Sequence, residues 1–407
     1  MEADRDRRHV VPIGVPGPLA EYESALQAEL VRTGYAPSSV TNAVEVMRRL
    51  SRWMGERGVS AAALSPAVVD KYLAFRRQSC HDAAAARSWV GTVLRFLQGQ
   101  GVVTAPDRED RTAIGVMLAA FRGWLVTERG LAPDTVRCYG TQARKFLAQL
   151  PAPLEDSISR LDGAAVITFV LGQATATANV GSAKAQVTAL RALLRFLHVQ
   201  GLIQTPLVAA VPGLAGWRAS ELPRILASAQ VEALLGTHDL STPVGLRDHA
   251  VLVTLARLGL RGGEIAALKI ADVEWRAGEI VIRGKGSRIE RLPLPAEVGS
   301  ALADYLTRGR PPCRCAAVFV GARAPHRPLT PSAVRAIMGR ACHLAGLPRL
   351  GAHRLRHTLA SDLLRAGSSL AEVGQILRHR SELSTATYAK IDHGTLGTLA
   401  RPWPGGA

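Results

Sequence analysis

Four residues near the C-terminal end of the chain have the types and spacing to act on a phosphate. They lie in the stretch GAHRLRHTLASDLLRAGSSLAEVGQILRHRSELSTATYAK, where His353 precedes Arg356 by three positions and His379 precedes Tyr388 by nine. Positions i and i+3 share a helix face, so His353 and Arg356 can point at one target. An arginine fork binds a phosphate bidentately, and histidine exchanges protons near neutral pH. The H-x-x-R pattern alone is more often a solvated helix face.

Further residues of the same chemistry lie upstream. The segment LARLGLRGGEIAAL carries Arg261 and Glu264, and Lys285 follows Arg261 by 24 residues. The sequence EIVIRGKGSRIERLPLP around Lys285 predicts two strands joined by a tight turn over 284–287. Lys285 would then lie at a hairpin tip, where a lysine is otherwise a solvated turn residue.

This ordered set resembles the catalytic residues of the tyrosine recombinase (phage integrase) family. The resemblance is carried by the phrases GLRGGEIAAL, GKGSRIERLPLP and HRLRHTLASDLL, together with LRHRSELSTATYAKI, and it covers about residues 226 to 390. The order of these residues, the spacing between them and the sequence around each of them all agree with the pattern of that family.

The resemblance implies a role for each residue. Tyr388 is expected to be the nucleophile, which forms a 3′-phosphotyrosyl bond and frees a 5′-hydroxyl. Arg261 and Arg356 are expected to hold the phosphate and offset the charge of its transition state. Glu264 would orient Arg261 through an ion pair, and Lys285 would protonate the leaving 5′-oxygen.

The histidines divide between chemistry and packing. By the same resemblance, His353 would act as acid and base beside Tyr388, and His379 would donate a hydrogen bond to the phosphate. His357 is interpreted as structural. The family often has an apolar and then a small polar residue where this chain has Gly262 and Gly263. Because glycine disfavours helix by about 1 kcal/mol relative to alanine, a looser helix start is expected there, and whether it slows the reaction stays open.

The reaction implied is the cutting and rejoining of DNA by a site-specific recombinase. The bond energy is kept in the phosphotyrosine, so no cofactor, metal or ATP is expected. The expected partners are double-stranded DNA sites, further copies of the chain in a homo-tetramer, and accessory or partner recombinases. An integrase or transposase of a mobile element is the leading interpretation. A type IB topoisomerase and a catalytically inactive architectural DNA-binding protein are the alternatives.

Composition supports a polyanionic partner. The chain has 407 residues, 47% of them hydrophobic, and a formal net charge of +17 that arginine dominates. Arginine pairs with phosphate and stays charged, so this excess suits DNA. A GC-rich genome would explain arginine in place of lysine, but not the excess of positive charge.

Cysteine usage and hydropathy exclude other classes. The five cysteines are an odd number, which argues against a disulfide framework. The spacing of Cys313, Cys315 and Cys342 is poor for zinc, whose structural sites use pairs two to four residues apart. There is no signal-like start and no apolar run of 18 residues. We therefore expect a cytoplasmic protein that is nucleoid-associated when bound to DNA.

The first half of the chain repeats itself. RTGYAPSSV at 32–40 returns as ERGLAPDTV at 128–136, and VLRFLQGQGVV at 93–103 returns as LLRFLHVQGLI at 193–203. The offsets are 96 and 100, in the same order, which indicates a duplicated four-helix unit. The second copy occupies the position of the family's core-binding, SAM-like domain, and whether the first copy grips DNA or another protein stays open.

The expected fold is mainly α with a small antiparallel sheet: two tandem SAM-like four-helix domains followed by a tyrosine-recombinase catalytic domain. Between the second copy and the catalytic domain, three prolines interrupt a segment interpreted as the linker. A short strand is also expected at 318–321. The predicted boundaries are a disordered 1–16, helical domains at 17–104 and 112–204, a linker at 205–226 and a catalytic domain at 227–400.

Overall fold

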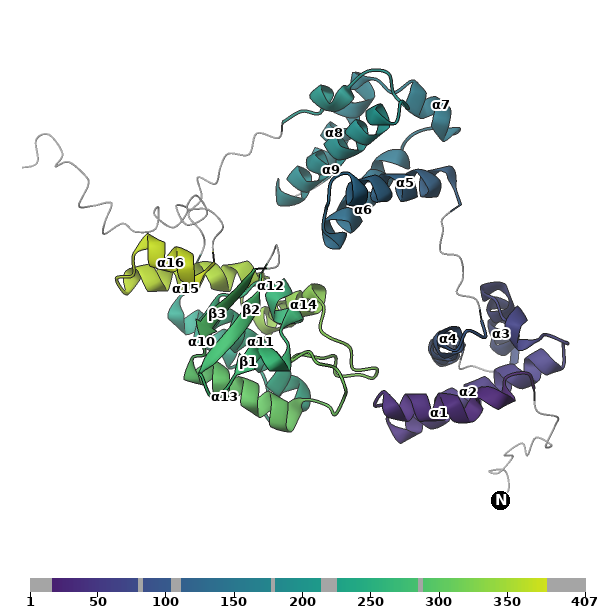
Figure 1. Ribbon diagram of the computed structural model, residues 1–407, viewed down its shortest axis with the longest axis horizontal. Helices are drawn as coiled ribbons and strands as arrows, with labels where there is room; N and C mark the ends of the chain where they lie inside the picture. The colour runs from purple at the N-terminus through teal and green to yellow at the C-terminus, as the bar shows by residue number, and fades with distance from the viewer. Residues whose placement is uncertain are drawn as a thin grey trace, which may run out of the picture. The chain divides into compact units, whose positions relative to one another are not determined.

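The chain is mainly helical. The structure, a computed structural model, describes residues 17–79, 83–103, 111–176, 180–213, 225–284 and 288–378 (Figure 1). Within these ranges the strands form one three-stranded antiparallel sheet, and every other regular element is a helix, which confirms the predicted fold class. No helix of this part is long and apolar enough to cross a membrane. The N-terminal segment predicted to be disordered lies outside the described residues.

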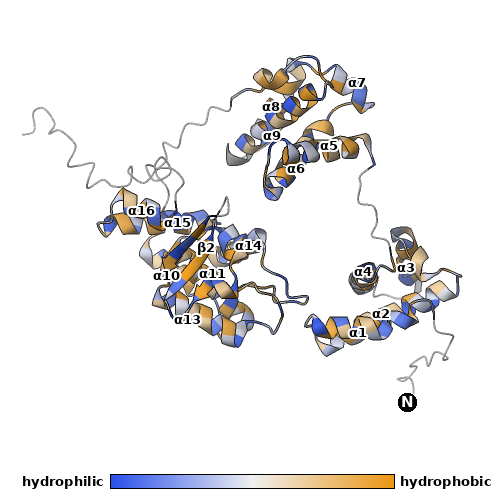
Figure 2. Cartoon of the chain, in the orientation of Figure 1, coloured by the Kyte–Doolittle hydropathy of each residue, from blue (hydrophilic) through white to orange (hydrophobic). Residues whose placement is uncertain are grey.

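Residues 17–103 form a helical unit with its own hydrophobic core. Its elements are η1 (Ala20–Tyr22), α1 (Glu23–Arg32), α2 (Pro37–Gly55), η2 (Ala61–Ala63), α3 (Pro66–Ser79) and α4 (Ala83–Gly99). Helix α2 buries Val44, Met47, Leu50 and Met54 on one face, the 3.6-residue periodicity of an amphipathic helix. Hydrophilic and hydrophobic colours alternate along it in Figure 2. This face packs against α1 and α4.

Residues 111–213 form a second unit with a separate core. It contains α5 (Ala113–Thr127), α6 (Pro133–Leu147), α7 (Leu154–Ser159), α8 (Gly163–Ala176), α9 (Val180–Val199) and η3 (Leu207–Ala210). Helix α6 packs against α5 and α9. The short helix α7 is an addition to the four helices expected. Leu207 and Val211, from the segment interpreted as a linker, are buried in this core.

The two units share details of backbone and burial at the repeated phrases. Gly34 and Gly130 have φ of 85° and 55°, and Gly101 and Gly201 have φ of 72° and 71°, conformations that glycine adopts without steric cost. Helices α2 and α6 both start at a proline, the favoured first helical residue. Positions 100 apart on α4 and α9 are buried in both units; they are Val90 and Leu190, Val93 and Leu193, Phe96 and Phe196, Leu97 and Leu197.

Residues 225–378 carry the sheet and the candidate site. The helices are α10 (Ser228–Leu235), α11 (Pro243–Leu258), α12 (Gly262–Ala267), η4 (Ile270–Asp272), α13 (Ala296–Asp304), the π-helix η5 (Tyr305–Gly309), α14 (Pro331–Leu344), α15 (Ala352–Arg365) and α16 (Leu370–Ile376). The strands are β1 (Val273–Glu274), β2 (Glu279–Arg283) and β3 (Ile289–Pro293), in the order β1-β2-β3. The predicted hairpin is confirmed, with Ile280 opposite Leu292 and Arg283 opposite Ile289.

Helix α11 is the centre of this core. It is buried on nearly every side, and α10, α12, α13, η5, α14 and α15 all pack against it. Helix α11 therefore sets the positions of α12 and α15, the helices that bear the candidate arginines.

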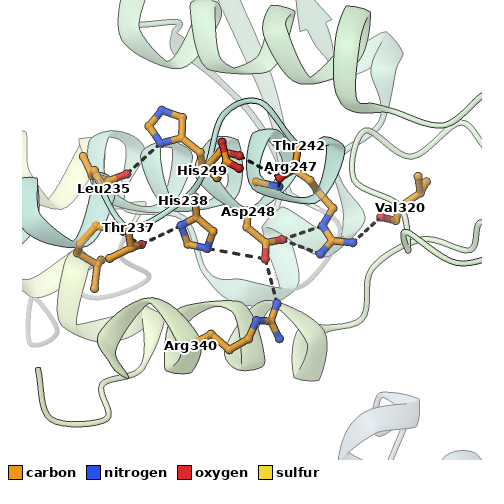
Figure 3. Close-up of polar contacts among 12 residues, drawn as sticks. Leu235, Thr237, His238, Thr242, Arg247, Asp248, His249, Val320 and Arg340 are labelled. Atoms are coloured by element: carbon orange, nitrogen blue, oxygen red, sulfur yellow. Dashed lines mark hydrogen bonds and ion pairs between the residues drawn. The ribbon is translucent and has the colours of Figure 1, made fainter. Parts of the chain in front are cut away.

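A buried ion network ties α11 to α14 (Figure 3). The Asp248 carboxylate, with a side chain 2% exposed, accepts two hydrogen bonds from Arg247 (2.8 and 2.7 Å) and one from Arg340 on α14 (2.9 Å). His238 Nε2 lies 3.8 Å away, and burial lowers the pKa of His238 although Asp248 opposes the shift. Arg247 also donates to the Val320 carbonyl. Buried charges persist only when paired in this way, so the network fixes α14, on which α12 packs.

The strand expected at 318–321 does not form. The described structure contains only isolated bridges there, between Lys269 and Ala317 and between Val320 and Pro328. Val318 and Phe319 are fully buried, so the apolar run reflects burial rather than a ladder. Proline lacks the N–H that a continuing ladder needs, and Pro328 occupies the partner position.

Candidate active site

Arg261 lies where two helices meet. Helix α11 ends at Leu258, and Gly259 follows in the left-handed conformation with φ of 57°. Arg261 is then the extended N-cap residue of α12. Glu264 accepts a hydrogen bond from the Arg261 backbone N–H (2.9 Å) and another from Arg261 Nη1 (2.7 Å). The ion pair predicted between these residues is therefore present, and it orients a guanidinium that is 35% exposed.

The hydrogen bond from the Arg261 backbone N–H to Glu264 holds the glycine pair that follows Arg261. Gly262 and Gly263 are the first two residues of α12, where a carboxylate three residues after the N-cap satisfies an otherwise unpaired backbone N–H. A side-chain carbon at Gly263 would meet nothing within 4 Å, and one at Gly262 would meet only ordinary contacts. The looser start expected from glycine is thus opposed by the Glu264 cap.

Arg356 lies on α15 and is almost fully buried, at 3% exposed. Its Nη1 donates to the Gly259 carbonyl at 2.6 Å, and its Nη2 donates to the Leu377 carbonyl. The Cβ of any larger residue at Gly259 would approach the Leu377 side chain within 2.8 Å. Arg356 therefore anchors two chain segments.

His353 lies one turn before Arg356 on the same helix and is solvent-accessible. Partial burial of its ring, then the positive charges of Arg356 and Arg261, lower the pKa of His353, and Glu264 opposes them. The imidazole is therefore neutral at pH 7, the form that accepts a proton. The half-buried His357 also has a lowered pKa, because of burial first and then electrostatic repulsion by its neighbours His353, Arg354 and Arg356.

Glu264 contacts a second arginine that the sequence did not single out. Arg378 Nη2 donates to Glu264 Oε2 at 2.8 Å, and Arg378 Nε lies 3.5 Å from Glu290 Oε2 on β3. Burial raises the pKa of Glu264, but the hydrogen bond from the Arg261 backbone and the charges of Arg378 and Arg261 outweigh it, so the pKa is lowered. Glu264 stays ionised and is shared between two arginines. The sequence LRHRSEL shows that Arg378 directly precedes His379, but it carries no signal of this contact.

The hairpin between β2 and β3 approaches the same carboxylate. Lys285 lies outside the described residues, but its flanks are described, and the Gly284 N–H donates to the Arg288 carbonyl at 2.8 Å. A carbon placed at the Cβ position of Gly284 would lie 4.0 Å from Glu264 Oε1. Residue 284 is therefore next to the arginine cluster.

The described structure thus brings four of the predicted residues together, namely Arg261, Glu264, His353 and Arg356. His379 and Tyr388 lie beyond residue 378, outside the described ranges. Two guanidinium groups beside a neutral imidazole suit a phosphate diester, because arginine binds its oxygens and histidine can accept a proton. The cluster has the composition of a phosphoryl-transfer site.

Comparison with known proteins supplies the family. The model of the phage integrase family matches residues 224–394. The integrase/recombinase y4rA of Sinorhizobium fredii (strain NBRC 101917 / NGR234) is 38% identical over 398 residues, which are 96% of each chain. The tyrosine recombinase XerC of Pelobacter propionicus is 30% identical over 277 residues, 67% of this chain and 90% of XerC. The structure of XerH bound to its palindromic difH substrate has a TM-score of 0.54 at 20% identity, over 78% of this chain and 95% of that chain, and it shares the fold.

The chain belongs to the tyrosine recombinase (phage integrase) family. It is a site-specific DNA recombinase, an enzyme that breaks and rejoins DNA strands through a tyrosine-linked intermediate without metal or ATP. Topoisomerase activity and a purely architectural role are not favoured.

Proposed function

We propose that Tyr388 attacks the scissile phosphate while Arg261 and Arg356 hold its non-bridging oxygens. The bond between phosphorus and the 5′-oxygen breaks as a bond between phosphorus and the tyrosine oxygen forms, which leaves a 3′-phosphotyrosine and a 5′-hydroxyl. The observation that supports this most is the convergence of α12 and α15: the Gly259 carbonyl, two residues before Arg261, accepts from Arg356 at 2.6 Å. Preorganised donors of this kind stabilise charge as it develops in the transition state.

His353 is the proton acceptor for the Tyr388 hydroxyl in this proposal. Its lowered pKa keeps it neutral at pH 7, and its position one turn from Arg356 faces the same phosphate. His379 donates to a phosphate oxygen. Lys285 supplies the proton to the leaving 5′-oxygen, and Gly284 beside Glu264 is consistent with that position.

Lys285→Ala tests the proton donor. With an ordinary nicked duplex, cleavage should slow by roughly 10²- to 10⁴-fold, the usual contribution of a general acid. With a 5′-phosphorothiolate at the scissile position, the leaving sulfur needs no proton, so the variant should cleave close to the wild-type rate. The measurement is the single-turnover rate of covalent complex formation on the two substrates.

Two comparisons make that result specific. Lys269→Ala removes an exposed lysine of the same domain and should cleave both substrates normally. Arg261→Ala should stay slow on the sulfur substrate, because its charge stabilises the phosphate rather than the leaving group. If sulfur rescues neither variant or both equally, the acid is another residue.

We also propose that the enzyme acts on two DNA sites as a homo-tetramer, for a mobile element, with accessory or partner recombinases. The support is the family membership and the description of y4rA as an integrase/recombinase. Association with DNA would place the protein at the nucleoid. The assembly is tested by the mass of the complex with target DNA: two duplexes and four subunits are expected, and a single subunit on one duplex would contradict the proposal.

A further proposal concerns residues 17–104 and 112–204, which we interpret as two copies of one SAM-like domain. The shared positive-φ glycines, the proline helix starts and the burial at positions 100 apart support a duplication. The match to XerC covers 67% of this chain, whereas the match to y4rA covers 96%. We propose that the first copy extends the grip on DNA.

The arginines of the first copy differ in their partners. Arg48, Arg49 and Arg87 pair with carboxylates of the same unit. No carboxylate among the described residues pairs with Arg52, Arg77 or Arg95. Because their positive charges are not neutralised by a neighbouring carboxylate, these three are the better candidates for phosphate contacts.

The salt dependence of DNA binding tests whether the first copy contacts DNA phosphates. Each neutralised phosphate contributes about 0.9 to the slope of log affinity against log salt. Changing Arg52, Arg77 and Arg95 together to Gln should therefore flatten the slope by up to about three units in a gel-shift titration. The same change at Arg48, Arg49 and Arg87 should flatten it less. If the slope and the footprint are unchanged in the first variant while assembly fails, the first copy is instead a protein-docking domain.

A further inference from the structure

Arg378 has a backbone conformation that its residue type disfavours. It is the one non-glycine residue with positive φ in the described part of the chain, at 56°. A side chain in this region places Cβ against the following carbonyl, and arginine lacks the short polar side chain that lets asparagine or aspartate tolerate it. Such conformations persist where the surroundings hold them, and they cluster at functional sites.

Contacts of the Arg378 side chain hold the residue in this conformation. It is 4% exposed, and its Nη2 donates to Glu264 Oε2 at 2.8 Å. Its Nε faces Glu290 on β3 at 3.5 Å. Three segments therefore meet at one guanidinium: the start of α12, the strand that leads out of the Lys285 hairpin, and the end of α16.

These contacts close a ring that includes both proposed phosphate-binding arginines. Glu264 binds Arg261 and Arg378. Arg356 binds the carbonyl of Leu377, the residue before Arg378, and the carbonyl of Gly259, two residues before Arg261. The next residue after Arg378 is His379, and Tyr388 lies nine residues beyond it.

We propose that Arg378 is a positioning residue, which uses Glu264 as a common anchor to set the start of the segment bearing His379 and Tyr388 relative to the Arg261 guanidinium. The inference rests on the proposed roles of Tyr388 and Arg261. Arg378 does not touch the phosphate in this proposal; it acts by placing the nucleophile. Misplacement of a reacting group by about 1 Å can cost about a hundredfold in rate.

The test separates this role from a structural one by the choice of variant. Arg378→Gly removes the guanidinium but adopts positive φ without cost, so the chain should stay folded with a melting temperature no lower than that of Arg378→Ala. DNA affinity of Arg378→Gly should remain within about twofold of wild type, while single-turnover formation of the phosphotyrosyl complex slows about ten- to a hundredfold. Arg378→Lys keeps a cation for Glu264 and should recover part of that rate. Arg365→Ala, at an exposed arginine paired to Asp362 on α15, should behave as wild type.

An external nucleophile tests positioning directly. In protein carrying Tyr388→Phe, hydrogen peroxide can attack the phosphate in place of the tyrosine, and cleavage then needs the phosphate-binding arginines but no placed nucleophile. Adding Arg378→Gly should lower this peroxide-supported rate much less than it lowers phosphotyrosyl formation, because only the contribution of His379 is affected, whereas adding Arg261→Ala should lower both rates to a similar extent. Wild-type phosphotyrosyl formation by Arg378→Gly would overturn the inference, as would an equal loss of peroxide-supported cleavage. A covalent complex that persists in Tyr388→Phe without peroxide would instead overturn the proposed nucleophile.

Discussion

Tyr388→Phe protein is expected to form no SDS-resistant complex with a nicked target duplex. Phenylalanine keeps the ring but lacks the oxygen that attacks phosphorus, so the loss should be about 10⁴-fold or more, the scale on which removal of a nucleophile acts. Binding should be unaffected, because DNA affinity is spread over many basic residues. Gel shift and denaturing electrophoresis on the same samples measure the two quantities.

A second tyrosine provides the control. Tyr139 is a half-buried residue on α6 that packs against the core of the second helical unit. Tyr139→Phe removes a hydroxyl from the same chain and should crosslink at the wild-type yield. Wild-type crosslinking by Tyr388→Phe would assign the covalent bond to another residue.

Much of the arrangement of the candidate active site follows from local sequence. The two short segments EIVIR and IERLP, with glycines between them, specify the hairpin, and the structure pairs the two strands antiparallel as expected. The pairing of Arg261 with Glu264 also follows locally, because a carboxylate three residues after an N-cap can reach back to it. The candidate site was predictable where its contacts are short in sequence.

Contacts between distant segments were not predictable from the same reasoning. The Arg378 ion pair joins residues 114 positions apart, and the Asp248–Arg340 pair joins residues 92 apart. Nothing in LRHRSEL indicates that its first arginine is buried, since periodicity gives a face and not a partner. The apolar run at 318–321 was misread for a related reason. Burial and strand formation give the same short apolar pattern, and only the segment that lies beside the run shows which of the two applies.

Arg261→Ala should separate catalysis from binding more cleanly than any change at Arg356. Removing one preorganised donor typically slows the chemical step about 10²- to 10³-fold, and we expect that loss in covalent complex formation with DNA affinity within about twofold. The fold should survive, because Glu264 keeps its hydrogen bond from Arg378 and is not left as an unpaired buried charge. Arg356→Ala is different: the residue is 3% exposed and its guanidinium holds the carbonyls of Gly259 and Leu377, so its loss should lower the melting temperature as well as the rate.

The matched control is Arg257 on the preceding helix. Its side chain is 32% exposed against 35% for Arg261, and it also pairs with carboxylates, Glu232 and Glu297. Arg257→Ala removes the same charge from a similar environment and should cleave at nearly the wild-type rate. Arg261→Lys keeps the charge without the planar fork, so its rate should fall between those of the wild type and Arg261→Ala. Equal losses of binding and cleavage in Arg261→Ala would show that this arginine grips DNA and does not stabilise the transition state.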